Sequence, residues 1–126
     1  MHDDRAVITN LDILCAEKGR ELAHINGMEE KVLNEALAVL EEQGPYAMFL
    51  YIRARYKKVE NAFTQTGCEL LRRVFPQKSL PDDIFDAIKS LAKNLDDLLF
   101  ARDLLRNTLA YARYHVKAGG NEEKTS

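Results

Sequence analysis

Hydrophobic residues recur at helical spacing along most of the chain, and the longest such run covers residues 94–118. This run contains no proline or glycine, and Gly119-Gly120 follows it as a stop signal. At about 100° per residue its apolar positions fill about half of the helix circumference, more than the stripe of a typical surface helix. We therefore expect it to be the central helix of a bundle. Its inner face consists of Leu98, Leu105, Leu109, Ala112 and Val116.

Turn signals divide the rest of the chain into shorter segments with the same spacing. Asn26-Gly27, Gly44-Pro45 and Pro76 are typical of turns and helix boundaries. The hydrophobic spacing between these signals predicts helices over residues 4–23, 28–42, 46–61, 67–75 and about 79–93.

The stretch Thr66-Gly67-Cys68-Glu69 decides whether the middle of the chain forms one helix or two. Thr66 and Glu69 have the spacing of a capping box, in which each side chain bonds to a backbone N–H near the start of a helix. We therefore expect a new helix to begin at Gly67. An uninterrupted helix through Thr64–Gly67 is the alternative, at a cost in helix propensity.

These segments predict an all-α fold. No stretch alternates between apolar and polar residues over a useful length, so we expect no sheet. The 126 residues suffice for one domain with a real core. We expect one helical domain over residues 1–118, a bundle of five to six helices with a long C-terminal helix. Residues 119–126, GGNEEKTS, have the composition of a disordered tail.

The sequence also indicates a cytoplasmic protein. The N-terminal MHDDRAV has no basic region followed by an apolar run, so it does not resemble a signal peptide. No apolar run approaches the roughly 20 residues of a membrane span, and we expect no membrane association. Cys15 and Cys68 are expected to be free, partly buried thiols.

The net charge of −2 conceals a strong asymmetry along the chain. Residues 1–52 have a net charge of −6, residues 53–78 of +5, and residues 79–126 of −1. A basic middle segment in a weakly acidic protein is typical of a subunit that contacts an anion on one side. The alternative is that acidic and basic helices face each other inside the fold.

Signals for catalysis are weak, and we expect neither enzymatic activity nor a cofactor. His2, His24 and His115 have no partner at metal-ligand spacing, so we predict no metal site and no catalytic residue. Asp96-Asp97 has the position of a helix cap. A small helical RNase is a third functional class, but the spacings of Arg106 and Arg113 to His115 do not fit the arginine–histidine motifs of such enzymes.

Signals for anion binding are stronger. On the last helix, four basic residues form one stripe about 60° wide beside the apolar face: Arg102, Arg106, Arg113 and Lys117. Arginine binds phosphate through two parallel hydrogen bonds, and tyrosines stack on bases. Tyr51, Tyr56, Tyr111 and Tyr114 are interleaved with the basic positions. The candidate RNA-binding residues are Arg53, Arg55, Lys57, Lys58, Arg72, Arg73, Arg102, Arg106, Arg113 and Lys117.

A structural role is the main rival for the stripe on the last helix. Arg102 and Arg106 have Asp103 as a local partner, and the acidic first half of the chain offers further carboxylates. Pairing of that kind leaves the stripe no free charge for a phosphate.

Three stretches of this sequence resemble the small all-helical subunit of type III CRISPR effector complexes, most nearly that of the type III-B (Cmr) complex. These stretches are DRAVITNLDILCAEKGRELAHI, KVLNEALAVLEEQGPYAMFLYIRAR and LAKNLDDLLFARDLLRNTLAYARYHVKA. The last resembles the family's final segment, in which an aspartate-led helix with an alanine-rich inner face ends in basic and aromatic residues. The resemblance lies in length, helix order and pattern, and it covers nearly the whole chain.

The resemblance implies a non-catalytic subunit of an RNA-guided antiviral complex. Subunits of this family stack end to end as a short filament, contact other effector subunits, and help to hold the duplex of crRNA and target RNA through basic side chains. The expected partners are therefore copies of the same chain, other CRISPR effector subunits, crRNA and target RNA. The alternative is a helical protein–protein adaptor or regulator without nucleic-acid binding.

Overall fold

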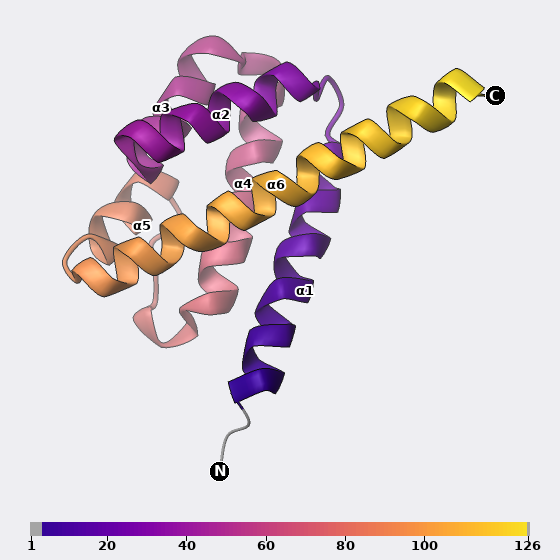
Figure 1. The fold of residues 1–126 in the computed structure, drawn as a ribbon. Coiled ribbons are helices and arrows are strands. Elements are labelled where there is room, and N and C mark those ends of the chain that lie inside the picture. The colour runs from indigo at the N-terminus through magenta and orange to yellow at the C-terminus, as the bar shows by residue number, and fades with distance from the viewer. Residues whose placement is uncertain (1–3, 126) are drawn as a thin grey trace.

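Six α-helices and one short 3-10 helix form the part of the chain that the computed structural model describes, the backbone of residues 4–125 and the side chains of residues 10–119. This part contains no strand, which confirms the all-α prediction (Figure 1). The elements are α1 (Asp4–Ala23), α2 (Glu30–Gln43), α3 (Pro45–Arg55), α4 (Lys57–Val74), η1 (Pro76–Lys78), α5 (Ile84–Leu91) and α6 (Leu95–Thr125).

The long helix α6 is central, as its broad apolar face predicts. It crosses the molecule diagonally and contacts α1, α2, α3 and α5 (Figure 1). Its inner face is buried and includes Ala101, Leu104, Leu105, Leu109 and Ala112.

The expected end of this helix at Gly119-Gly120 is wrong, since α6 continues to Thr125. Glycine costs about 1 kcal/mol in a helix without forbidding it. The predicted disorder of residues 119–126 stays a prediction, because the side chains of residues 120–126 lie outside the described residues.

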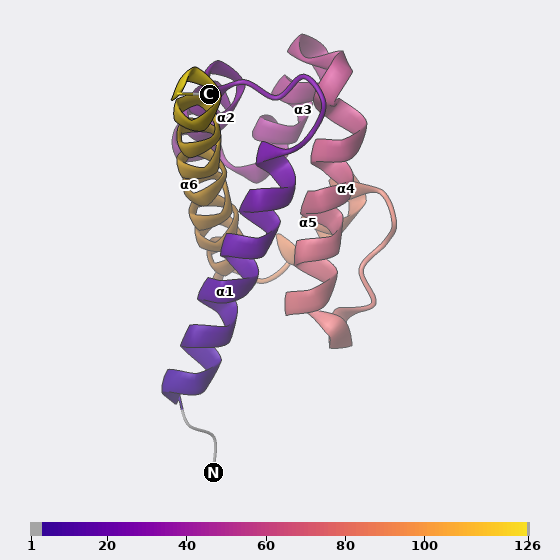
Figure 2. The same cartoon turned by 90° about the vertical axis from the view of Figure 1, so that its right-hand side faces the viewer.

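Helices α1 and α6 cross at Gly19, where α1 packs between α6 and α4 (Figure 2). A Cβ atom at Gly19 would lie 2.6 Å from the Cβ of Tyr111 and 2.7 Å from the carbonyl oxygen of Thr108. Only glycine lets the two backbones approach so closely. The bounds of α1 agree with those predicted from the sequence.

The division between α3 and α4 differs from the prediction. The chain breaks at Tyr56, and α4 runs without interruption through Gly67. The hydroxyl of Thr66 donates to the carbonyl oxygen of Ala62 at 3.0 Å, inside the helix, so it caps nothing. Gly67 serves packing instead, because a Cβ there would lie 2.6 Å from the ring of Phe49.

Two helix starts also differ in detail. Helix α2 begins at Glu30 rather than Met28, and Glu29 takes the N-cap position without a side-chain bond. Helix α5 begins at Ile84, because the carboxylate of Asp83 accepts the backbone N–H groups of Phe85 at 2.9 Å and Asp86 at 3.2 Å. Within the described residues, no helix is both long enough and apolar enough to cross a membrane.

Candidate nucleic-acid interface

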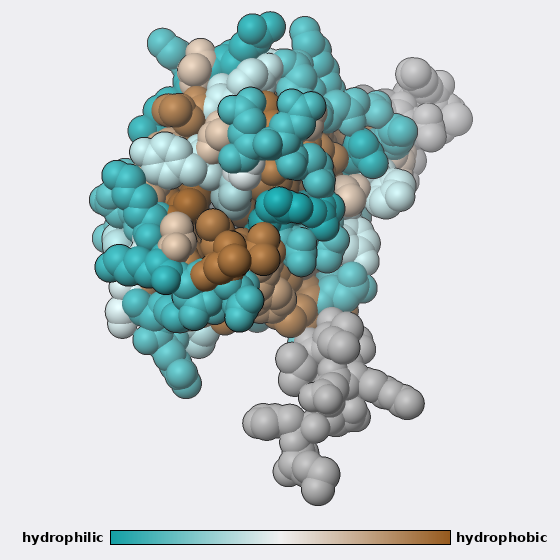
Figure 3. Space-filling view, turned by 60° about the vertical axis from the view of Figure 1, so that its left-hand side comes forward, coloured by the Kyte–Doolittle hydropathy of each residue, from teal (hydrophilic) through white to brown (hydrophobic). Residues whose placement is uncertain are grey.

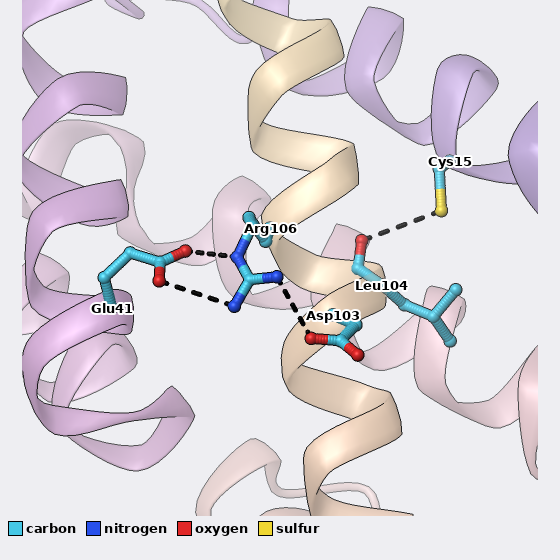
Figure 4. A network of polar contacts seen from close by, with 5 residues as sticks. All are labelled: Cys15, Glu41, Asp103, Leu104 and Arg106. Carbon is cyan, nitrogen blue, oxygen red and sulfur yellow. Dashed lines mark hydrogen bonds and ion pairs between the residues drawn. The ribbon is translucent and has the colours of Figure 1, made fainter.

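The basic stripe of α6 lies against α2 rather than in open solvent. Lys117 pairs with Glu30 at 3.3 Å, and Arg113 donates to the amide oxygen of Asn34 at 3.3 Å. Arg106 donates from Nε and Nη2 to the two carboxylate oxygens of Glu41 (Figure 4). The geometry therefore supports the alternative interpretation, pairing with acidic residues of the first half of the chain, for Arg106 and Lys117, whereas Arg113 bonds to a neutral amide.

The spacing of these partners explains the arrangement. The stripe positions recur at intervals of 4 and 7 residues on α6, and their partners recur at the same intervals on α2 in the opposite direction. Two antiparallel helices with matched spacing bring every pair into register. We call the pairs Lys117–Glu30, Arg113–Asn34 and Arg106–Glu41 the α2–α6 ladder.

Arg106 has a second partner, Asp103 on its own helix, at 3.1 Å (Figure 4). The hydrogen bond to Glu41, assisted by the charge of Asp103, raises the pKa of Arg106 and keeps it ionised. Arg102 lies one turn earlier on α6 and is half-buried. Its Nε atom is buried without a hydrogen-bond partner in the described part of the chain.

Two further candidates are also held by internal partners. The Nε atom of Arg53 pairs with Glu60 at 2.8 Å, and its guanidinium group lies 4.6 Å from the ring centroid of Phe85. Arg72 pairs with Asp82 at 2.6 Å, although both side chains are exposed. An exposed pair of this kind is weak and opens readily, so Arg72 retains some capacity for another anion.

Four candidates remain free. Arg55, Lys57, Lys58 and Arg73 are exposed, and within residues 10–119 they have no ion-pair or hydrogen-bond partner. Arg55 ends α3, Lys57 and Lys58 begin α4, and Arg73 lies in the last turn of α4.

The exposed side of α4 joins these cations into one surface. Its exposed positions fall within about 160° of the helix circumference. We call this surface the α4 outer face; it consists of Lys57, Lys58, Asn61, Ala62, Gln65, Glu69, Arg72 and Arg73. The structure therefore brings Lys57, Lys58, Arg72 and Arg73 together and places the α6 stripe on a different surface.

The acidic residues of α4 are neutralised from inside the fold. Glu60 pairs with Arg53, and Glu69 accepts from the buried amine of Lys18 at 2.9 Å. Burial lowers the pKa of Lys18, but hydrogen bonds to Glu69 and Glu21 outweigh it and leave the pKa raised. The hydrogen bond from Lys18 also lowers the pKa of Glu69. The α4 outer face is consequently left with a net positive charge.

Glu35 holds the junction between α3 and α4. This half-buried carboxylate on α2 accepts hydrogen bonds from the hydroxyl groups of Tyr51 and Tyr56. The two bonds lower the pKa of Glu35, and the positive charges of Lys31 and Arg55 lower it further. These two hydrogen bonds anchor Tyr56 at the break between α3 and α4, so that Arg55 and the start of α4 project outward.

The structural hydrogen bonds of the tyrosines bear on their expected role of stacking on bases. Tyr51 and Tyr56 are half-buried and bound to Glu35, and Tyr111 donates to Asp12 at 2.7 Å. Their hydroxyl groups are thus committed to structural contacts, and only Tyr114, 65% exposed, presents a largely open ring. Glu35, Asn61 and Gln65 were not among the residues predicted from the sequence. The uninterrupted polar stripe of α4 was the signal for the last two, and the expected break at Gly67 divided it.

No group of three or more His, Cys, Asp or Glu side chains that is arranged to hold a metal ion occurs among the described residues. Burial raises the pKa of the Cys15 thiol and of the Cys68 thiol, and both are free thiols in the fold. Comparisons of this chain with protein-family models, curated proteins and solved structures gave no match.

Proposed function

We propose that this chain is a non-catalytic small subunit of an RNA-guided antiviral complex, of the type III CRISPR class that its sequence resembles. In this proposal the α4 outer face, together with Arg55, contacts the phosphate backbone of the crRNA–target RNA duplex. The observation that carries the proposal is that Arg55, Lys57, Lys58 and Arg73 have no ion-pair partner within residues 10–119, whereas Arg106 and Lys117 of the α6 stripe pair with carboxylates of α2.

The dimensions of the α4 outer face support such a contact. Lys57 and Arg73 are 16 residues apart, which corresponds to about 24 Å along a helix. Asn61 and Gln65 lie between them and add neutral hydrogen-bond donors. A surface of this kind contacts phosphate and ribose oxygens without reading sequence, as expected of a subunit that must accept any guide.

The family resemblance adds two partners to the proposal. Copies of the chain stack end to end along the complex, and other effector subunits hold the stack.

The direct test is a charge reversal on the α4 outer face. In the assembled complex, the double variant Lys57→Glu, Lys58→Glu is expected to weaken RNA retention roughly tenfold or more, because two phosphate contacts become repulsions. The matched control is Lys89→Glu, Lys93→Glu, which makes the same charge change on and just after α5. Equal RNA retention in the two double variants, at equal thermal stability, would sink the proposal.

An adaptor function without RNA is the second candidate. Its support is apolar surface at the start of α6, where Leu95 is 67%, Leu99 43% and Phe100 39% exposed. Figure 3 shows hydrophobic surface ringed by hydrophilic side chains on the face that includes this end of the molecule. Co-purification separates the two functions: bound RNA of uniform length supports the first, and a single protein partner without RNA supports the second.

A further inference from the structure

A groove runs between α1 and α6, on a surface that the proposed RNA contact does not use. Its first section has a volume of about 410 Å³ and is lined by Leu11, Asp12, Cys15, Phe100, Asp103, Leu104 and Asn107. Its second section, of about 280 Å³, shares Asp12 and Asn107 with the first and continues along Ala110, Tyr111 and Tyr114. The shared residues place the two sections side by side, and the hydrogen bond from Tyr111 to Asp12 joins α1 and α6 beside them.

The shape of the groove follows from the helix crossing. Helices α1 and α6 touch at Gly19 and diverge from there toward the N-terminal end of α1 (Figures 1 and 2). In the space between them, the thiol of Cys15 approaches the carbonyl oxygen of Leu104 at 3.6 Å and closes the floor (Figure 4). The lining of α6 extends from Phe100 to Tyr114, about 21 Å or four helical turns.

The chemistry of the groove is apolar below and acidic at the rim. Leu11, Phe100 and Leu104 supply hydrocarbon surface, and no lysine or arginine lines the groove among the described residues. Asp12 accepts from Tyr111, and Asp103 accepts from Arg106 as an ion pair, each through Oδ1. The Oδ2 atom of each carboxylate has no hydrogen-bond partner within residues 10–119, so both carboxylates have capacity for a cation.

We infer that this groove is a docking site for an amphipathic helix of another protein. That helix presents apolar residues at positions i, i+3 or i+4, and i+7 to the floor, and places a lysine or arginine against Asp12 and Asp103. A third helix in the space between two diverging helices completes the packing that the crossing leaves open. Charge complementarity with Asp12 and Asp103 selects a basic helix. The inference does not depend on the proposed RNA contact.

The probes for this site are two synthetic peptides. Each is a fluorescein-labelled, 16-residue helix with leucine at every third or fourth position; one has lysines beside the leucine face and the other has glutamates at the same positions. Binding to the intact chain is followed by fluorescence anisotropy. The lysine peptide is expected to bind at least tenfold more tightly than the glutamate peptide.

Two groove variants and a matched control localise the binding. Asn107→Lys places a long cationic side chain in the middle of the groove from an exposed position. It is expected to weaken binding of the lysine peptide at least tenfold. Asp12→Asn with Asp103→Asn keeps the shape, removes both charges and is expected to reduce the preference for lysine over glutamate. Asn61→Lys, the same substitution on the α4 outer face, is expected to leave peptide binding unchanged.

Three results overturn the inference. Equal affinity for the two peptides excludes the acidic rim as a determinant, and unchanged binding in Asn107→Lys excludes the groove. Self-association of the wild-type chain that Asn107→Lys abolishes identifies a second copy as the occupant. RNA retention, measured on the same preparations, is expected to be unaffected by Asn107→Lys, so a failure here is distinguishable from a failure of the proposed function.

Discussion

At Gly19 a single hydrogen atom in place of a side chain sets the distance between two helices. The nearest atoms to a Cβ at this position belong to the backbone and Cβ of α6, at 2.6 to 2.9 Å, and none is the end of a flexible chain. Helical glycine is otherwise unfavourable by up to about 1 kcal/mol relative to alanine. Glycine here is therefore explained by the crossing, and the crossing in turn shapes the groove.

Gly19→Ala is expected to lower the free energy of unfolding by about 1–3 kcal/mol, because the added methyl group forces α1 and α6 apart. Urea denaturation followed by circular dichroism measures the change. The matched control is Gly119→Ala, where no atom lies within 4 Å of the new Cβ. That substitution is expected to be neutral or slightly stabilising. A neutral Gly19→Ala would contradict the close crossing.

Glu35 makes stability depend on pH in two directions. Hydrogen bonds from Tyr51 and Tyr56 lower its pKa from the ordinary 4.5, so the unfolded state binds protons first and stability falls as the pH drops below about 4.5. The same bonds raise the pKa of both tyrosines above the ordinary 10.0, so this contribution is lost again as the pH rises past 10.0.

The variant Glu35→Gln tests this dependence. The difference in unfolding free energy between wild type and Glu35→Gln is expected to be largest between about pH 5 and pH 10 and to shrink at both ends. Denaturation curves at pH 3.5, 7 and 10.5 measure it. A difference that does not change with pH would show that the tyrosine hydrogen bonds do not hold the ionised carboxylate.

Among the elements, the α2–α6 ladder shows what a helical pattern can and cannot predict. The stripe of Arg102, Arg106, Arg113 and Lys117 followed from the 3.6-residue period of one helix alone. Its partner depended on which helix packs beside it and in which direction, and a single sequence carries no such pairing. The acidic composition of the first half gave the charge of the partner without its register.

The variant Arg106→Ala is expected to lower the free energy of unfolding by about 1 kcal/mol, because its pair with Glu41 is partly exposed and has two hydrogen bonds. RNA retention is expected to be unchanged at temperatures where the variant is folded. Arg73→Ala is the control with the opposite profile, no measurable loss of stability and weaker RNA binding. Urea denaturation and filter binding give the two readouts.

The α3–α4 junction is the element that sequence reasoning misplaced. Glycine and a capping pattern at Thr66 to Glu69 favoured a boundary there on local grounds. The ring of Phe49, from another helix, requires glycine at position 67 for packing, and Tyr56 ends α3 with no local breaker in its sequence. Both causes are tertiary, so no local pattern contains them.

At the scale of the whole molecule, the cations fall into a set that is paired within the chain and a set that is free. Acidic residues of α2 and α4 neutralise α6 and α3, and the cations left over gather at the α3–α4 junction and along α4. The sequence predicted the all-α class, the central helix and the bounds of α1, because these depend on the spacing within each segment. It named basic residues of α3, α4 and α6 together as candidates, because which of them stay free depends on how the helices pair.

Salt dependence distinguishes the two sets of cations. RNA binding is expected to weaken with rising salt. The slope of the logarithm of affinity against the logarithm of salt concentration becomes more negative by about 0.7–0.9 for each phosphate neutralised. The double variant Arg55→Ala, Arg73→Ala is expected to reduce the magnitude of that slope by roughly 1.4 to 1.8, whereas Arg106→Ala leaves it unchanged. Affinities measured between 50 and 300 mM potassium chloride give the slopes, and identical slopes for all three proteins would assign the contact elsewhere.

The crossing of α1 and α6 also has a consequence for synthesis. The hydrogen bond from Tyr111 to Asp12 joins residues 99 positions apart, and α1 is translated before all the other helices. At about 5–20 residues per second, its apolar face waits roughly 5 to 20 seconds for the helix that covers it. Most helical bundles rely on neighbouring segments and fold early. This chain completes its core only when α6 has left the ribosome, and until then the face of α1 that packs on α6 stays uncovered.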